Sequence, residues 1–168
     1  NYQKFPGHFT VKNIIKMMSG FYPKWDNSYA YELLEYFKIP SKIKFSQLRA
    51  NESSIFLGII GLASRANITI FDDPVKDADA KDRYDFFNFL YTHFEIYPRT
   101  FIIATNFIDE IDFAIDTVLF VDNGKLIDVY DTQEIKENFV YLTGKSEVLK
   151  SLISGIKIIG VEERGKTL

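Results

Sequence analysis

Short apolar runs alternate along this chain with longer segments whose apolar residues recur every three to four positions. Two of the short runs, 68–72 and 100–104, are rich in Ile, Phe and Thr and have the length of buried strands. The longer segments have the period of an amphipathic helix. Strands of this kind, alternating with helices, favour an α/β core built on a parallel sheet.

Five helices are expected before the last third of the chain. Thr10 and Asp26 are typical N-caps for the first two, and Pro98 follows the end of the fourth. Gly58 and Gly61 stand three residues apart in the third, so we expect one face of that helix to approach a neighbour closely. The expected helices span residues 10–19, 28–37, 52–66, 79–96 and 108–115.

The last third of the chain predicts a hairpin followed by a small α+β extension. Apolar runs at 117–121 and 126–129 flank the sequence Asp122-Asn123-Gly124-Lys125, and Asn-Gly is a strong signal for a two-residue hairpin turn. Asp131 or Thr132 is expected to cap a short helix. The tail beyond about Asn138 predicts a strand, a helix at 146–152 and a strand at 156–161.

Composition narrows the classes of function. The chain has 168 residues, 46% hydrophobic and 26% charged, which is enough for a packed core. A net charge of −3 gives no electrostatic support for a nucleic-acid partner. The absence of cysteine excludes disulfides and thiolate chemistry. No apolar run reaches the roughly 18–20 residues that a membrane-spanning helix needs.

Candidate chemistry gathers where the two predicted parallel strands end. Asp72 and Asp73 close the first strand, Pro74 stops it, and Asp79 follows six residues after Asp73. Asn106 comes just after the second strand. Paired carboxylates at the carboxyl end of such a strand are where phosphate-handling α/β proteins hold Mg²⁺ and a water-activating base.

An ordered series of segments resembles the nucleotide-binding domain of ABC-transporter ATPases. The aromatic segment at 21–26 is similar to one in the bacitracin-type and GntR-operon-associated exporters of Gram-positive bacteria. Each motif alone is weak, but six in the right order and spacing are strong. They are the segment after the Q-loop at 5–11, the aromatic segment, the signature position at 48–54, a Walker B-like run at 68–74 with a D-loop-like run at 75–80, the H-loop position at 104–106 and the closing hairpin at 122–125.

The resemblance implies an incomplete P-loop NTPase core of α/β class, with a helical subdomain and a small C-terminal α+β extension. The expected domains are a helical subdomain at 1–47, an ABC ATPase-like core at 48–130 and the extension at 131–168. In this family the phosphate loop precedes the segment that Asn1 begins, so we expect it upstream of these residues. ATP and Mg²⁺ are the implied ligands.

Several positions depart from the family pattern. Arg49 stands for the serine of the signature and Asn51 for its first glycine, which lets the backbone approach a γ-phosphate held by the partner subunit. Asp73 replaces the catalytic glutamate, and Asn106 replaces the histidine that orders the attacking water. Asp72 keeps the residue type that coordinates Mg²⁺, usually through water. These departures predict a subunit that hydrolyses ATP weakly or not at all.

The implied function is that of a nucleotide-binding subunit of an ABC exporter, peripheral to the cytoplasmic face of the membrane. Its implied partners are a transmembrane permease subunit and a second ATP-binding subunit, identical or different. In a head-to-tail dimer, Arg49, Asn51 and Asp79 belong to the nucleotide contacts made across the interface. The transported substrate is set mainly by the membrane subunit, and the subfamily implies a peptide or toxin-like amphipath.

Simpler interpretations stay open for the individual residues. Asp72 and Asp73 form an acid pair that solvation or helix capping also explains, and Asp79 is a good N-cap for the next helix. Arg49 and Asn51 are either inert replacements or, through the arginine, a source of charge for phosphate. The aromatic segment at 21–26 is either core or the face that receives a helix of the membrane subunit.

Three other functions compete with the degenerate subunit. The first is an active ABC ATPase whose phosphate loop lies upstream and which tolerates Asp73. The second is a stand-alone binding module that uses the fold only as a scaffold. The third, a response-regulator receiver domain, needs a phosphoacceptor aspartate that ends a strand between Asp73 and Thr105, and the sequence has none there.

Overall fold

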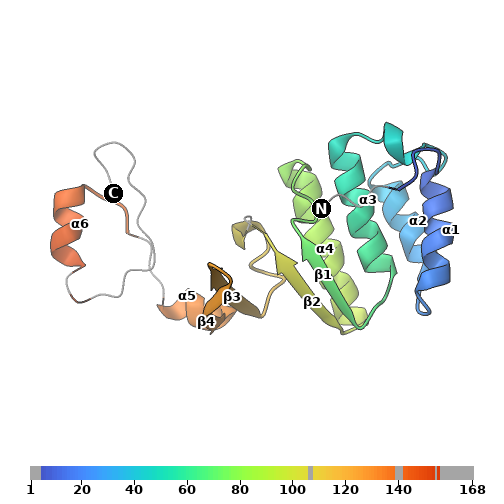
Figure 1. Ribbon diagram of the computed structural model, residues 1–168. Coiled ribbons are helices and arrows are strands. Elements are labelled where there is room, and N and C mark those ends of the chain that lie inside the picture. The colour runs from blue at the N-terminus through green and yellow to red at the C-terminus, as the bar shows by residue number, and fades with distance from the viewer. Residues whose placement is uncertain (1–4, 106–107, 139–141, 154, 156–168) are drawn as a thin grey trace. The chain divides into compact units, whose positions relative to one another are not determined.

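The computed structural model describes residues 5–105, 108–138, 142–153 and 155. The chain forms two compact units, Asn1–Ile115 and Asp116–Leu168, which we describe one at a time. Figure 1 shows their elements. Asn106 lies outside the described residues.

The first unit starts with helices whose caps the sequence predicted. The Thr10 hydroxyl accepts a hydrogen bond from the Asn13 amide, and an Asp26 carboxylate oxygen accepts one from the Tyr29 amide. An Asp79 carboxylate oxygen accepts one from the Asp82 amide at 2.8 Å. The elements are α1 (Val11–Phe21), α2 (Asn27–Tyr36), η1 (Phe45–Gln47), α3 (Ala50–Ala63), β1 (Ile68–Asp72), α4 (Ala80–Ile96), β2 (Thr100–Ala104) and η2 (Ile108–Glu110).

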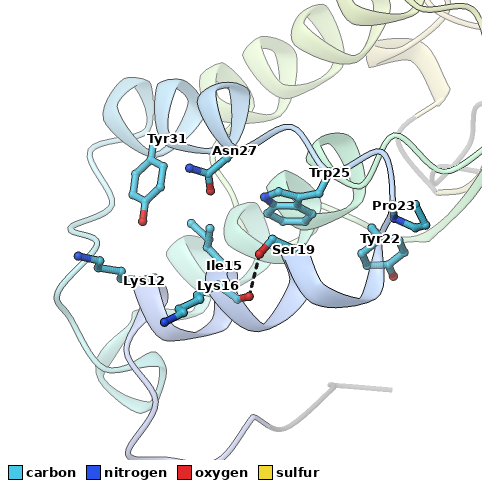
Figure 2. Close-up of a pocket in the computed structure, with 9 residues that line it drawn as sticks. All are labelled: Lys12, Ile15, Lys16, Ser19, Tyr22, Pro23, Trp25, Asn27 and Tyr31. Atoms are coloured by element: carbon cyan, nitrogen blue, oxygen red, sulfur yellow. Dashed lines mark hydrogen bonds between the residues drawn. The ribbon is translucent and has the colours of Figure 1, made fainter.

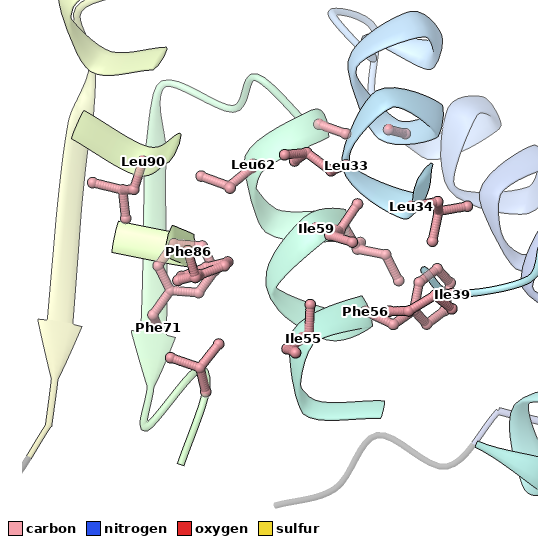
Figure 3. Close-up of a cluster of buried hydrophobic side chains, with 14 of the residues drawn as sticks. Leu33, Leu34, Ile39, Ile55, Phe56, Ile59, Leu62, Phe71, Phe86 and Leu90 are labelled. Atoms are coloured by element: carbon pink, nitrogen blue, oxygen red, sulfur yellow. The ribbon is translucent and has the colours of Figure 1, made fainter. Parts of the chain in front are cut away.

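Strands β1 and β2 form a parallel pair, as the sequence predicted. Their register joins Ile68 to Thr100 and Asp72 to Ala104, so both strands end at the same edge of the sheet. The side chains of Thr69 and Phe71 are buried on one face. Helix α3 lies between this sheet and helix α2, and the fully buried Phe56 and Phe86 fill the space on its two sides (Figure 3).

Two glycines of α3 let aromatic rings pack directly onto the helix. A Cβ added at Gly58 would lie 2.4 Å from the Phe86 ring, and one added at Gly61 would lie 2.4 Å from the Phe71 ring. These separations are far below an ordinary contact, so no side chain fits at either position. The close approach that the glycine spacing predicted is confirmed, with α4 and β1 as the neighbours.

The opposite face of the parallel pair is apolar and exposed. Ile68, Ile70 and Ile102 have 60%, 70% and 45% of their surface accessible to solvent. No described residue covers them. Parallel sheets are normally covered on both faces, because their strands are apolar on both sides.

Two predicted helices have different ends in the structure. Helix α3 stops at Ala63 because Arg65 takes a left-handed backbone, with φ of 47°, and the guanidinium of Arg99 binds the carbonyls of Gly61, Leu62 and Ala66. The helix expected at 108–115 is only the single turn η2. Its Ile111 amide bonds the carbonyl three residues back, the spacing of a 3₁₀ turn.

The second unit contains the predicted hairpin, in which β3 (Thr117–Asp122) pairs antiparallel with β4 (Lys125–Asp131). Asn123 and Gly124 both have positive φ, 46° and 73°, as a type I′ turn requires. Helices α5 (Thr132–Asn138) and α6 (Ser146–Leu152) follow. The strand predicted at 156–161 lies outside the described residues. Within the described ranges, no helix is long and apolar enough to cross a bilayer.

Candidate functional site

The predicted acid pair lies at the carboxyl edge of the parallel strands. Asp72 ends β1 and is exposed to solvent. The Asp73 amide donates a 2.8 Å hydrogen bond to the Ala104 carbonyl, which fixes the turn against the end of β2. Asp73 has a φ of 45°, in the left-handed region that few non-glycine residues occupy. Strained backbone of this kind concentrates at functional sites.

One oxygen of the Asp73 side chain is an acceptor without a donor. Its Oδ1 atom is buried and no described group donates a hydrogen bond to it. Buried acceptors are normally satisfied, so this oxygen fits a partner that is not part of these residues, such as a water or an ordered donor of a bound ligand.

The two carboxylates suit Mg²⁺ held together with a phosphate ligand. Mg²⁺ in nucleotide sites is bound through one or two carboxylates and takes its other ligands from water and phosphate oxygens. Among the residues that the structure describes, no group of three acidic or histidine side chains could hold a metal by itself. Asp72 and Asp73 match the one or two carboxylates that such a site takes from the protein.

The loop after the acid pair is fixed by both flanking helices. The buried Ser54 of α3 donates a hydrogen bond from its hydroxyl to the Pro74 carbonyl at 2.9 Å. The Val75 and Ala78 side chains are buried, and Asp79 caps α4. Sequence reasoning missed Ser54, because nothing local distinguishes it from other serines on an apolar helix.

The start of α3, where the sequence predicted a phosphate contact, is occupied by the protein's own carboxylate. Glu52 accepts the Arg49 amide at 2.9 Å and pairs with the Arg49 guanidinium at 2.7 Å. These hydrogen bonds from Arg49 lower the pKa of the Glu52 carboxyl. Asn51 lies in the first turn of the same helix and is partly exposed. The guanidinium of Arg49 is thus already bound to an anion, the side chain of Glu52.

Replacing Glu52 should loosen the start of α3. We expect Glu52→Ala to lower the free energy of unfolding by about 1 kcal/mol, because it removes the carboxylate that accepts the Arg49 amide and the charge that complements the helix N-terminus. Chemical denaturation measures this. Glu95→Ala, an exposed position near the end of α4, is the matched control and should stay within about 0.5 kcal/mol. Equal losses in both variants would contradict the capping role.

A separate pocket of about 470 Å³ lies between α1 and α2 (Figure 2). Lys12 and Lys16 line one side of it, and the stacked rings of Tyr22 and Trp25 lie at one end, with centroids 6.3 Å apart. No acidic residue is among the lining residues, which are Lys12, Ile15, Lys16, Ser19, Tyr22, Pro23, Trp25, Asn27 and Tyr31. Phe21 beside it is 71% exposed. The predicted aromatic segment is thus partly core and partly surface.

A literal phosphate-loop pattern also occurs near the end of the printed sequence. Residues 160–167 read Gly-Val-Glu-Glu-Arg-Gly-Lys-Thr, which matches the spacing Gly-x-x-x-x-Gly-Lys-[Ser/Thr]. The pattern identifies a phosphate loop only between a strand and a helix, and the family order places that loop before the signature. These residues lie outside the described part of the chain, so the match stays a sequence pattern.

Comparison with known proteins gives relatives among the ABC-transporter ATP-binding proteins. No family model matches the chain. The ABC transporter ATP-binding protein YtrB of Bacillus subtilis is 24% identical over 136 residues, which cover 81% of this chain and 47% of that protein. Among solved structures, an ATP-binding subunit of an ABC transporter superposes with a TM-score of 0.68 at 10% identity, over 80% of this chain and 57% of that one.

A dimeric bacterial ABC transporter cassette, MJ0796, superposes with a TM-score of 0.66 at 16% identity, over 78% of this chain and 61% of that one. The chain therefore spans about half the length of the curated relative it matches. The α/β fold class and the resemblance to ABC-transporter ATP-binding subunits are confirmed. By fold, the chain is similar to part of the solved nucleotide-binding domains that it matches.

Proposed function

We propose that this relative of the ABC-transporter ATP-binding proteins is a nucleotide-binding subunit of an exporter, with weak or no ATP hydrolysis of its own. The observation that carries the proposal is the acid pair at the carboxyl end of β1 in a chain with the ABC ATPase fold. Asp72 would hold Mg²⁺ and Asp73 would face the attacking water. In this role the chain works at the cytoplasmic face of a membrane.

The exposed apolar face of strands β1 and β2 suggests that another part of the domain packs against it. Ile68, Ile70 and Ile102 form an apolar surface that needs a cover. We infer that the part of the nucleotide-binding domain that carries the phosphate loop packs on this face and brings ATP to the edge where Asp72 and Asp73 lie. The proteins that this chain matches are longer, since it spans about half of their length.

Weak hydrolysis follows from the side chains at the reacting positions. Aspartate is one methylene shorter than glutamate, so its carboxylate lies roughly 1.5 Å further from a water placed for glutamate, and a misplacement near 1 Å can slow a reaction about a hundredfold. Asn106, which lies outside the described residues, cannot carry a proton as histidine can. Arg49 is already paired with Glu52, so it offers less charge to a phosphate across a dimer interface.

The same proposal names two protein partners. The pocket between α1 and α2, with Phe21 exposed beside it, would receive a segment of a transmembrane permease subunit. A second ATP-binding subunit would pair with this one head to tail, and the bacterial cassette MJ0796, which is similar in fold, is a dimer. Arg49, Asn51 and Asp79 would then lie at the shared nucleotide sites.

Restoring the family residues tests the proposed loss of hydrolysis. In the full-length protein as its gene encodes it, we expect Asp73→Glu with Asn106→His to raise the ATP turnover number roughly a hundredfold, because the longer carboxylate reaches the water and the histidine can carry charge. Phosphate release measures the rate. Asp122→Glu, at the end of β3 in the second unit, lengthens an exposed carboxylate to which the proposal gives no part in catalysis, and it should leave the rate unchanged.

Two outcomes would replace this proposal. Turnover by the wild type that equals that of the restored variant would favour an active ABC ATPase. Failure of the full-length wild type to bind MgATP, measured by calorimetry, would favour a non-catalytic binding module that keeps the ABC fold as a scaffold.

A further inference from the structure

The guanidinium of Arg83, in the second turn of α4, binds two loops at once. Its Nη1 atom donates a hydrogen bond to the Ala78 carbonyl at 2.7 Å. Its Nε and Nη2 atoms donate to the two carboxylate oxygens of Glu110, both at 2.7 Å. The contact with Glu110 is therefore bidentate, the geometry that fixes an arginine in a single orientation.

These two loops follow neighbouring parallel strands. Ala78 belongs to the loop after β1 that begins with Asp73, and Glu110 lies in η2, six residues after the end of β2. The start of the first loop is fixed by the Asp73 amide on Ala104 and by Ser54 on Pro74. Its end is held through Arg83, so a shift of Glu110 either carries Ala78 with it or breaks the contact.

The Arg83–Glu110 ion pair is buried enough to hold one geometry. The Arg83 and Glu110 side chains are 14% and 31% exposed. By contrast, Lys81 in the ion pair Lys81–Asp85 on the same helix is 75% exposed. Exposed single pairs contribute little, whereas a bidentate and partly buried arginine–carboxylate pair holds one geometry.

We propose that Arg83 and Glu110 are positioning residues that couple the loop after β2 to the loop after β1. Nucleotide bound at the strand ends would shift Glu110, and Arg83 would pass the shift to Ala78 and the loop 73–79. This inference rests on the proposed function, since that function places ATP at these strand ends.

Amide hydrogen exchange in the full-length protein tests the coupling. The Ala78 amide bonds the Val75 carbonyl and the Ile111 amide bonds the Ile108 carbonyl, so each reports on one loop. In Glu110→Gln we expect both amides to exchange about tenfold faster, because the charged, bidentate contact is lost. MgATP should slow Ala78 exchange in the wild type and leave it unchanged in the variant. Lys81→Gln, which breaks the exposed pair on the same helix, should change neither amide.

The charge swap Arg83→Glu with Glu110→Arg separates positioning from stability. It restores the ion pair, but a glutamate at position 83 cannot donate to the Ala78 carbonyl. If the two loops are coupled as proposed, the Ile111 amide regains its protection from exchange while the Ala78 amide still exchanges fast. Recovery of both amides in the swap, or equal Ala78 exchange in the wild type and Glu110→Gln, overturns it. If MgATP changes no exchange in the wild type while Glu110→Gln still accelerates Ala78, the proposed function fails and the link between the loops stands.

Discussion

Lowering the pH from 7 to 4 is expected to remove about 3 kcal/mol of folding free energy through His93 alone. His93 is 4% exposed, and both of its ring nitrogens are buried without a hydrogen-bond partner. Burial, and then the nearby charges of Arg99 and Arg65, lower the pKa of this imidazole from 6.5 to about 4. The folded protein therefore resists protonation at a site that the unfolded chain protonates freely.

The direction of the effect follows from which state binds more protons. Between pH 6.5 and about 4, the unfolded chain carries the His93 proton and the folded protein does not. The contribution of neutral His93 to the free energy of unfolding is therefore complete above pH 6.5 and is lost as the pH drops toward 4. Lowering the pKa of His93 from 6.5 to about 4 corresponds to about 3 kcal/mol of folding free energy at pH 4.

The groups that face His93 do little to stabilise a proton on its imidazole. Tyr29 of α2 stacks on the imidazole with ring centroids 4.5 Å apart, and Tyr97 lies 5.2 Å away. Arg65 and Arg99 repel a proton there, and among the groups that the structure describes only Asp26, itself paired with Arg65, attracts one. A protonated His93 would therefore place a third cation in a buried cluster.

His93→Phe should remove this pH dependence. Phenylalanine keeps an aromatic ring against Tyr29 and cannot titrate, so the free energy of unfolding at pH 4 and 7 should differ by about 3 kcal/mol less than in the wild type. Urea denaturation at a series of pH values measures the difference. His8→Gln, which removes the exposed histidine, should behave like the wild type. If His93→Phe keeps the pH profile of the wild type, His93 is not the acid-sensitive group.

The second large effect is expected from a single methyl group at Gly58. We expect Gly58→Ala to lower the free energy of unfolding by about 2 kcal/mol, although alanine is favoured over glycine in a helix by up to about 1 kcal/mol. The new Cβ would lie 2.4 Å from Cε2 and 2.8 Å from Cζ of Phe86. That ring is fully buried and packs edge-on against Phe71 and Phe87, so it has little room to move.

Gly20 provides the matched control for that substitution. It lies in α1 with no atom near the place where a Cβ would be, so Gly20→Ala should raise the free energy of unfolding by about 0.5–1 kcal/mol. Thermal denaturation compares the two. In Gly58→Ala with Phe86→Leu, the loss should be smaller than the sum of the two single losses, because the smaller side chain makes room. A neutral or stabilising Gly58→Ala would mean that α3 and α4 do not pack as closely as the structure has them.

Much of the local structure could be predicted, because local patterns and capping chemistry determine it. Thr10, Asp26 and Asp79 cap the helices that their sequence neighbours predicted, and Asn123-Gly124 forms the tight turn that requires positive φ. The parallel pairing of β1 and β2 was predicted from two apolar runs separated by a helix. The prediction of a helix at 108–115 was wrong, because the local pattern could not show that only the 3₁₀ turn η2 forms there.

By itself, the sequence determined the α/β class, the helix starts, the hairpin and the position of the acid pair, since each depends on residues close together in the chain. Only the tertiary structure decided that Ser54 and the Arg83–Glu110 pair hold the loop after Asp73, and that His93 lies buried beside two arginines. Those features depend on side chains that folding brings together from separate elements, and their energies come from burial and hydrogen-bond geometry. Neither burial nor geometry is encoded in the local pattern of apolar and polar residues.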